Sequence, residues 1–219
     1  RFKVSWMPPE GVRNQKRFER GKRVPPNAEL GVGGVDSYDL DATVDGRGSK
    51  GALHLYNKFH MEHPSNMFVL EYASRPPLAK IFYEDCLMAA VFYGYFETRG
   101  YDGYLMNRPR HLSAPNAKMN VKTKGIPSNS QEVIQAHAHA IEAYIHDHVG
   151  INRETGEYGK TYFNRTLEDW IGFKIDNRTK FDLSISSGLC LLAAQKVKVK
   201  KKQSNLSEAK FFRRYKPIG

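Results

Sequence analysis

Three acidic residues stand where predicted secondary structure meets solvent. Asp36 ends an apolar strand predicted over residues 31–36, Glu97 ends a short aromatic strand predicted over 95–97, and Asp182 lies in the first turn of the last apolar helix. Carboxylates from different strand and helix ends can converge above a sheet edge and bind Mg²⁺ or Mn²⁺. Two such ions about 4 Å apart neutralise a scissile phosphate and activate a water as nucleophile. The chemistry indicated is metal-dependent cutting of a phosphodiester.

Two of these acids, Glu97 and Asp182, also fit plainer roles. Asp182 suits a helix N-cap or an acid favoured by the helix dipole, and Glu97 taken alone is typical of a surface residue at a strand end. The loop that follows Asp36 is rich in Gly and Ser and carries three more acids, which Asx turns explain better than chemistry does. These three are Asp39, Asp41 and Asp45.

The composition predicts one globular domain with a polyanionic partner. The chain has 219 residues, of which 40% are hydrophobic and 12% aromatic, and its 34 Lys and Arg against 23 Asp and Glu give a net charge of +11. This excess favours nucleic acid over a membrane surface. Cys86 and Cys190 lie in apolar runs and are expected to be buried thiols in a reducing compartment rather than a disulfide or a zinc site. No signal peptide or membrane-spanning run is found, so a soluble, intracellular protein is expected.

The elements predicted around the acids alternate between strands and helices. Strands are expected over residues 31–36, 52–56, 68–73 and 95–97, and helices over 77–93, 131–149, 161–173 and 180–195. The helix over 77–93 is apolar on nearly every face, which predicts burial against a sheet. Four histidines on the helix over 131–149 fall into i, i+2 pairs, which cannot share a face, so they do not predict a metal site. They are His137, His139, His146 and His148.

Three basic segments flank or interrupt this pattern. Residues 1–30 are expected to be a linker, in which a solvated role is favoured over phosphate binding, and residues 196–219 a basic tail. Residues 108–130 are turn-rich and predict a loop that guides DNA toward the acids. The basic residues of this loop are Arg108, Arg110, Lys118, Lys122 and Lys124.

Five stretches of the sequence together resemble the nuclease domain of the large terminase subunit, the DNA-packaging enzyme of tailed bacteriophages. They are GGVDSYD at 33–39, SKGALHLY at 49–56, EYASRPPLAKIFYEDCLMAAVFYG at 71–94, FE at 96–97 and FDLSISSGL at 181–189. The Arg-Pro followed by FYE and an alanine-rich helix is the most specific of these. The resemblance implies an α/β domain of the ribonuclease H-like class over residues 31–195, with a mixed central sheet flanked by helices.

The resemblance also implies a site, a substrate and partners. Asp36, Glu97 and Asp182 would be the catalytic acids and the ligands of two Mg²⁺ or Mn²⁺ ions, and concatemeric double-stranded viral DNA would be the substrate. The partners would be the terminase ATPase motor domain, the small terminase subunit and the portal, in the cytoplasm of the host cell, with no membrane involved.

The chain departs from that family at two points. A second acid often accompanies the third catalytic one, yet Leu183 follows Asp182 and leaves Asp176 as a distant candidate. No Gly-rich phosphate-binding loop occurs, so the motor domain is expected to lie outside this chain. Two alternatives remain: a non-catalytic nucleic-acid-binding module, in which the acids are caps and turn formers, and a nuclease of the resolvase or transposase type.

Overall fold

The computed structural model describes residues 2–26, 31–36, 51–58, 65–74, 96–107, 124–126, 131–151, 154, 156, 159 and 161–195. The strands are β1 (Lys3–Val4), β2 (Arg17–Glu19), β3 (Lys22–Val24), β4 (Gly31–Asp36), β5 (Gly51–Asn57) and β6 (Met67–Ser74). The α-helices are α1 (Glu10–Arg13), α4 (Gln131–Tyr144), α5 (Asn164–Gly172) and α6 (Asp182–Gln195). Shorter helical turns are η1 (Asp102–Tyr104), η3 (Ile145–Val149) and η4 (Ile175–Lys180).

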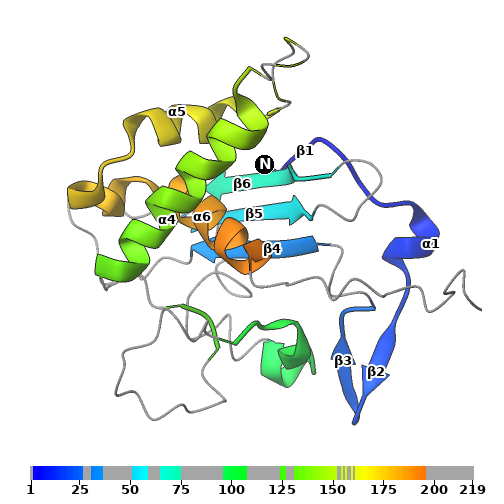
Figure 1. Cartoon of the computed structure of the whole chain (residues 1–219). Helices are drawn as coiled ribbons and strands as arrows, with labels where there is room; N and C mark the ends of the chain where they lie inside the picture. The colour runs from blue at the N-terminus through cyan, green and yellow to red at the C-terminus, as the bar shows by residue number, and fades with distance from the viewer. Residues whose placement is uncertain are drawn as a thin grey trace, which may run out of the picture.

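The predicted α/β class is confirmed in general terms, but the described strands form an antiparallel sheet and not the mixed sheet that was predicted. Four strands pair in the order β1-β6-β5-β4, and every pair is antiparallel. Helix α6 packs directly on β4 and β5, and α4 and α5 pack on α6 (Figure 1). The core thus lies in layers, with α6 between the sheet and the outer helix α4. Among the described residues, no helix is long and apolar enough to cross a membrane.

Strand β5 shows how the alternating sequence builds this core. Ala52, His54 and Tyr56 are buried beneath the helices, whereas Leu55, between them, is exposed on the other face. Tyr56 and three further aromatic side chains form a cluster of edge-to-face contacts, in which the centroids of contacting rings lie between 5.1 and 6.0 Å apart. Such pairs add stabilisation beyond the apolar area that they bury. The three are Phe68, Tyr144 and Trp170.

Helix α6 carries small residues because other backbone lies close to it. A Cβ on Gly34 of β4 would lie 2.1 Å from the Ser186 carbonyl oxygen and 2.8 Å from the Cys190 nitrogen. On another face, a Cβ on Gly188 would lie 3.2 Å from the His137 side chain of α4. The Cys190 thiol is fully buried and donates to the His54 carbonyl at 3.3 Å, and burial raises the pKa of this thiol. The expectation of a buried thiol is thus confirmed for Cys190.

The predicted strands at residues 31–36, 52–56 and 68–73 and the helices at 131–149, 161–173 and 180–195 are confirmed, with boundary shifts of a few residues. The described part of residues 1–30, which was expected to be a linker, contains short strands and a helix. Strand β1 pairs with the edge of β6, and β2 and β3 form a hairpin whose turn residues, Arg20 and Gly21, both have positive φ. Two such residues form the tight turn that matches strand twist. The helix expected over 77–93 and Cys86 lie outside the described residues.

We predict that Gly34→Ala destabilises the fold by about 1–3 kcal/mol, because the new methyl group would overlap the backbone of α6. Gly33→Ala is the matched control. Its Cβ would lie 3.2 Å from the flexible end of Leu55, on the opposite face of the sheet, and in ordinary contact with the His54 carbonyl oxygen at 3.7 Å. Urea unfolding of the two variants measures the difference. Equal stability of both variants would show that α6 does not lie against β4 at this point.

Candidate functional site

Asp36 and Asp182 lie at the same end of the sheet. Asp36 is the last residue of β4 and pairs with Ala52 of β5. Ala52 packs in one cluster with Ala73 and with Leu183, which directly follows Asp182 at the start of α6. Along β4, Asp36 has the same parity as Val32 and Gly34, so its side chain lies on the face that α6 covers. Both acids are partly buried.

A third acid, Asp169, anchors the first turn of α6. Its Oδ2 accepts the backbone N–H of Ser184 at 2.7 Å and the Ser184 hydroxyl at 2.8 Å. The N–H groups of a first helical turn have no partner within the helix, so this carboxylate satisfies one of them. The contact also joins α5 to α6. It therefore fixes the orientation of the first turn of α6, which carries Asp182, relative to α5.

Glu97 lies in a helical segment, so the prediction of a strand that ends at this residue is wrong. Residues 96–98 are helical and Glu97 is exposed. Gly100, with φ of 70°, donates to the Glu97 carbonyl at 3.0 Å, and Tyr101 donates to the Phe96 carbonyl at 2.6 Å. This bonding pattern is the glycine-closed end of a helix. Gly100 was the signal in the sequence that pointed to a helix end rather than to a strand.

The segment that carries Glu97 packs beside the β2–β3 hairpin. The backbone N–H of Arg23 donates to the Gly100 carbonyl at 3.0 Å, and Lys22 forms an ion pair with Asp102. The hydrogen bond with Asp102 raises the pKa of Lys22, and the charge of Glu97 adds a smaller effect in the same direction. Within the described part of the chain, no three or more His, Cys, Asp or Glu side chains form a group that could hold a metal. The structure thus brings Asp36 to the same end as Asp182, without Glu97.

Most of the predicted DNA-guiding loop lies outside the described residues, including Arg108, Arg110, Lys118 and Lys122. Lys124 is described. It forms a β-bridge with Asn107, and its Nζ donates to the Leu105 carbonyl at 3.1 Å.

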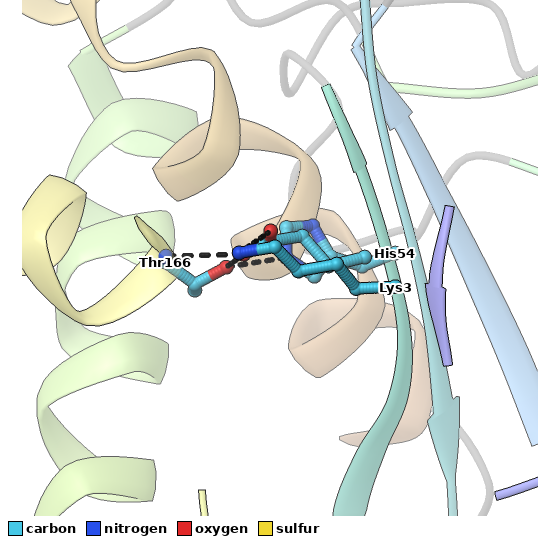
Figure 2. A network of polar contacts seen from close by, with 4 residues as sticks. Lys3, His54 and Thr166 are labelled. Atoms are coloured by element: carbon cyan, nitrogen blue, oxygen red, sulfur yellow. Dashed lines mark hydrogen bonds and ion pairs between the residues drawn. The ribbon is translucent and has the colours of Figure 1, made fainter. Parts of the chain in front are cut away.

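A buried polar network crosses the interface between the sheet and the helices, and the sequence analysis did not predict it. Figure 2 shows Lys3, His54 and Thr166 meeting there. Glu71 of β6, only 1% exposed, accepts the Thr166 backbone N–H at 3.1 Å and the Thr166 hydroxyl at 2.6 Å. Lys3 Nζ lies 3.5 Å from the other oxygen of Glu71. A buried carboxylate without such partners would strongly destabilise the fold.

His54 continues the network to α6. Its Nε2 lies 2.8 Å from the Thr166 hydroxyl and its Nδ1 lies 2.7 Å from the Ser186 hydroxyl. Burial lowers the pKa of His54 to about 3, so the ring is neutral near pH 7. Because the Thr166 hydroxyl donates to Glu71, it accepts from His54 Nε2–H, and Nδ1 then accepts from Ser186. Polar residues at inward-facing positions of alternating strands were the signal for this network.

A cleft of about 280 Å³ opens at the other end of the sheet, beyond the end of β5. The buried Lys58 lies in its lining with His148 of η3 and the C-terminal end of α6. Burial raises the pKa of the two lining phenols, Tyr56 and Tyr144. Burial also lowers the pKa of His148, and the charge of the adjacent Asp147 opposes this effect only in part. The two carboxylates Asp36 and Asp182 are not part of this cleft.

Comparisons of the chain with family models, with curated proteins and with solved structures found no match.

We predict that Thr166→Val destabilises the protein by about 1–3 kcal/mol, because it leaves His54 Nε2–H without its acceptor and removes one donor from buried Glu71. Thr166→Ser keeps the hydroxyl and is the control. Thermal and urea unfolding compare the two. If Thr166→Ser and Thr166→Val lose the same stability, the hydroxyl does not carry the network.

The His54 pKa predicts a loss of stability in acid. The folded-state pKa of about 3 lies below the value of about 6.5 for an unfolded chain, so the unfolded state binds the proton first as pH falls. The unfolding free energy should therefore decrease from pH 6.5 toward pH 3, and this group contributes up to about 1.4 kcal/mol per pH unit. Urea titrations across this range should show a shallower slope for His54→Gln. The exposed His139→Gln should keep the parental slope.

Proposed function

We propose that the chain is a metal-dependent endodeoxyribonuclease of the ribonuclease H-like class. The observation that carries this proposal is the position of Asp36 and Asp182, two carboxylates at one end of the sheet and on the side that α6 covers. Acids from a strand end and a helix start supply oxygen ligands from two rigid elements. The local sequence around each acid does not explain why the two share this end of the sheet.

The donor set suits a hard divalent cation. Carboxylate oxygens are the ligands that Mg²⁺ and Mn²⁺ prefer, and Asp36 and Asp182 would hold such ions. A bound metal would supply charge neutralisation at the phosphate and a more acidic water. Glu97 enters as the third ligand on the resemblance to terminase nucleases alone, because the described residues contain no group of three suitable side chains.

The net charge of the chain and its sequence resemblance to terminase nucleases support double-stranded DNA as the substrate. A net charge of +11 favours a polyanion, and the motifs around both acids resemble those of the large terminase subunit. The proposed reaction is the cutting of concatemeric double-stranded viral DNA during genome packaging. A terminase ATPase motor, a small terminase subunit and a portal would be the partners, and the host cell cytoplasm would be the location.

We expect Asp36→Asn and Asp182→Asn each to abolish Mn²⁺- or Mg²⁺-dependent cleavage of supercoiled plasmid, because each removes a charged metal ligand. Their unfolding transitions should stay cooperative. The control is Glu168→Gln, which neutralises an exposed acid on α5 and should cut at the parental rate. Parental cleavage by Asp36→Asn with either metal would refute the proposed site.

Glu97→Gln tests the third ligand separately. The resemblance predicts that this variant also loses cleavage. Because Glu97 is exposed, its substitution should leave the fold intact. Normal cleavage by Glu97→Gln, combined with loss in Asp36→Asn, would restrict the site to the two acids at the sheet end.

A further inference from the structure

The β2–β3 hairpin forms a basic arm with an exposed aromatic ring. Within 16–24, Lys and Arg occupy five positions and Glu19 is the one acid. Phe18 stands among them and remains 59% exposed, so its ring adds little to the core. Neither the carboxylate pair nor the polar network uses this arm.

The arm is held firmly by the segment that follows Glu97, as Figure 1 shows for β3 and its neighbour η1. The Arg23 N–H donates to the Gly100 carbonyl at 3.0 Å, and Lys22 pairs with Asp102. A Cβ on Gly103 would lie 2.7 Å from the Arg23 carbonyl oxygen, so glycine is needed for this close contact. The arm is thus pre-positioned before any partner binds.

The guanidinium of Arg23 orders the aromatic surface. Its Cζ lies 4.8 Å from the centre of the Tyr101 ring and 5.9 Å from that of Phe18, and it donates to the Tyr101 hydroxyl. Phe18 and Arg23 are directly opposite in the hairpin, so both side chains lie on one face. Cation–π contact of this kind holds the phenyl ring in place while leaving most of it open to solvent.

We propose that this arm binds single-stranded nucleic acid, with an unpaired base stacked on Phe18 and neighbouring phosphates held by Arg17 and Arg20. Duplex DNA hides the faces of its bases within the stack, so an exposed ring can take a base only from an unpaired strand. Arginine supplies the phosphate contacts. This inference rests on the proposed nuclease function, which would bring DNA to the protein. It deepens that function by naming unpaired DNA as a bound form.

The test is fluorescence anisotropy with a labelled oligothymidylate and with a duplex, both without divalent metal. Phe18→Ala should weaken binding of the single strand about tenfold, a typical loss for one stacked base, and leave duplex binding unchanged. Phe18→Trp should restore it. Ile171→Ala is the control, because Ile171 is an 87% exposed apolar residue on α5, outside the basic β2–β3 hairpin. Thermal melting should show no change for any of these variants.

The phosphate contacts are tested by the double variant Arg17→Gln with Arg20→Asn. Asparagine suits position 20 because φ there is 51°. The slope of log K against log salt should fall by about 1.4, since each phosphate contact adds about 0.7 for a single strand. Lys174→Gln, which removes an exposed charge between α5 and η4, should leave the slope unchanged.

Three results would overturn the inference. If Phe18→Ala keeps the parental affinity for the single strand, base stacking on Phe18 is excluded. If Phe18→Ala loses as much affinity for the duplex as for the single strand, the arm contacts only the phosphate backbone. Binding to phosphatidylserine vesicles instead of oligonucleotides would assign the arm to a membrane. Because binding is measured without metal, a parent protein that binds through Phe18 but never cleaves plasmid would refute the nuclease proposal alone.

Discussion

The close approach of the α6 backbone to β4 is the constraint on which the rest of the structure depends. Gly34 permits it, because any side chain there would enter the space of the Ser186 carbonyl. With α4 packed on its other side, α6 loses contact with water along most of its length. A helix in that position must be apolar or small on nearly every face, and its sequence, DLSISSGLCLLAAQ, is both.

Burial of α6 creates a second requirement, because its serines carry hydroxyl groups that water cannot reach. Each finds a partner outside α6: Ser184 with Asp169 of α5, Ser186 with His54 of β5, and Ser187 with the indole of Trp170, also of α5, at 2.9 Å. Polar contacts of this kind are directional, whereas apolar packing alone tolerates sliding. They therefore hold the first turn of α6, which begins with Asp182, in one orientation against the strands.

The acids and the basic arm have complementary roles in the proposed function. A carboxylate pair repels phosphate until a cation binds, so attraction of a polyanion must come from elsewhere in the chain. The β2–β3 hairpin supplies positive charge on a rigid support, fastened by the same segment that carries Glu97. Because the basic residues that attract DNA and the acids that would bind metal lie on different segments, a strongly basic protein can have acids at its candidate site.

Much of the fold was predictable because its signals are local. Alternation in GVGGVD and GALHLY indicates strands, and the unbroken apolar run after Asp182 indicates a buried helix, since side-chain periodicity is a property of the element itself. The same patterns singled out Asp36 and Asp182. The hairpin at residues 17–24 and the helical turn at Glu97 were missed because their signals were single glycines, Gly21 and Gly100, whose backbone conformation outweighed the surrounding composition.

The sequence by itself determined the class of elements, the net charge and the identity of the candidate acids. Only the tertiary structure decided which of them lie at the same end of the sheet. Asp36 and Asp182 are 146 positions apart, and they share one end of the sheet because antiparallel pairing brings Ala52 beside Asp36 and Leu183 packs on Ala52. The partners of His54 and Glu71 were likewise decided by packing, because a buried polar group selects its partner from whatever the fold brings within hydrogen-bonding distance.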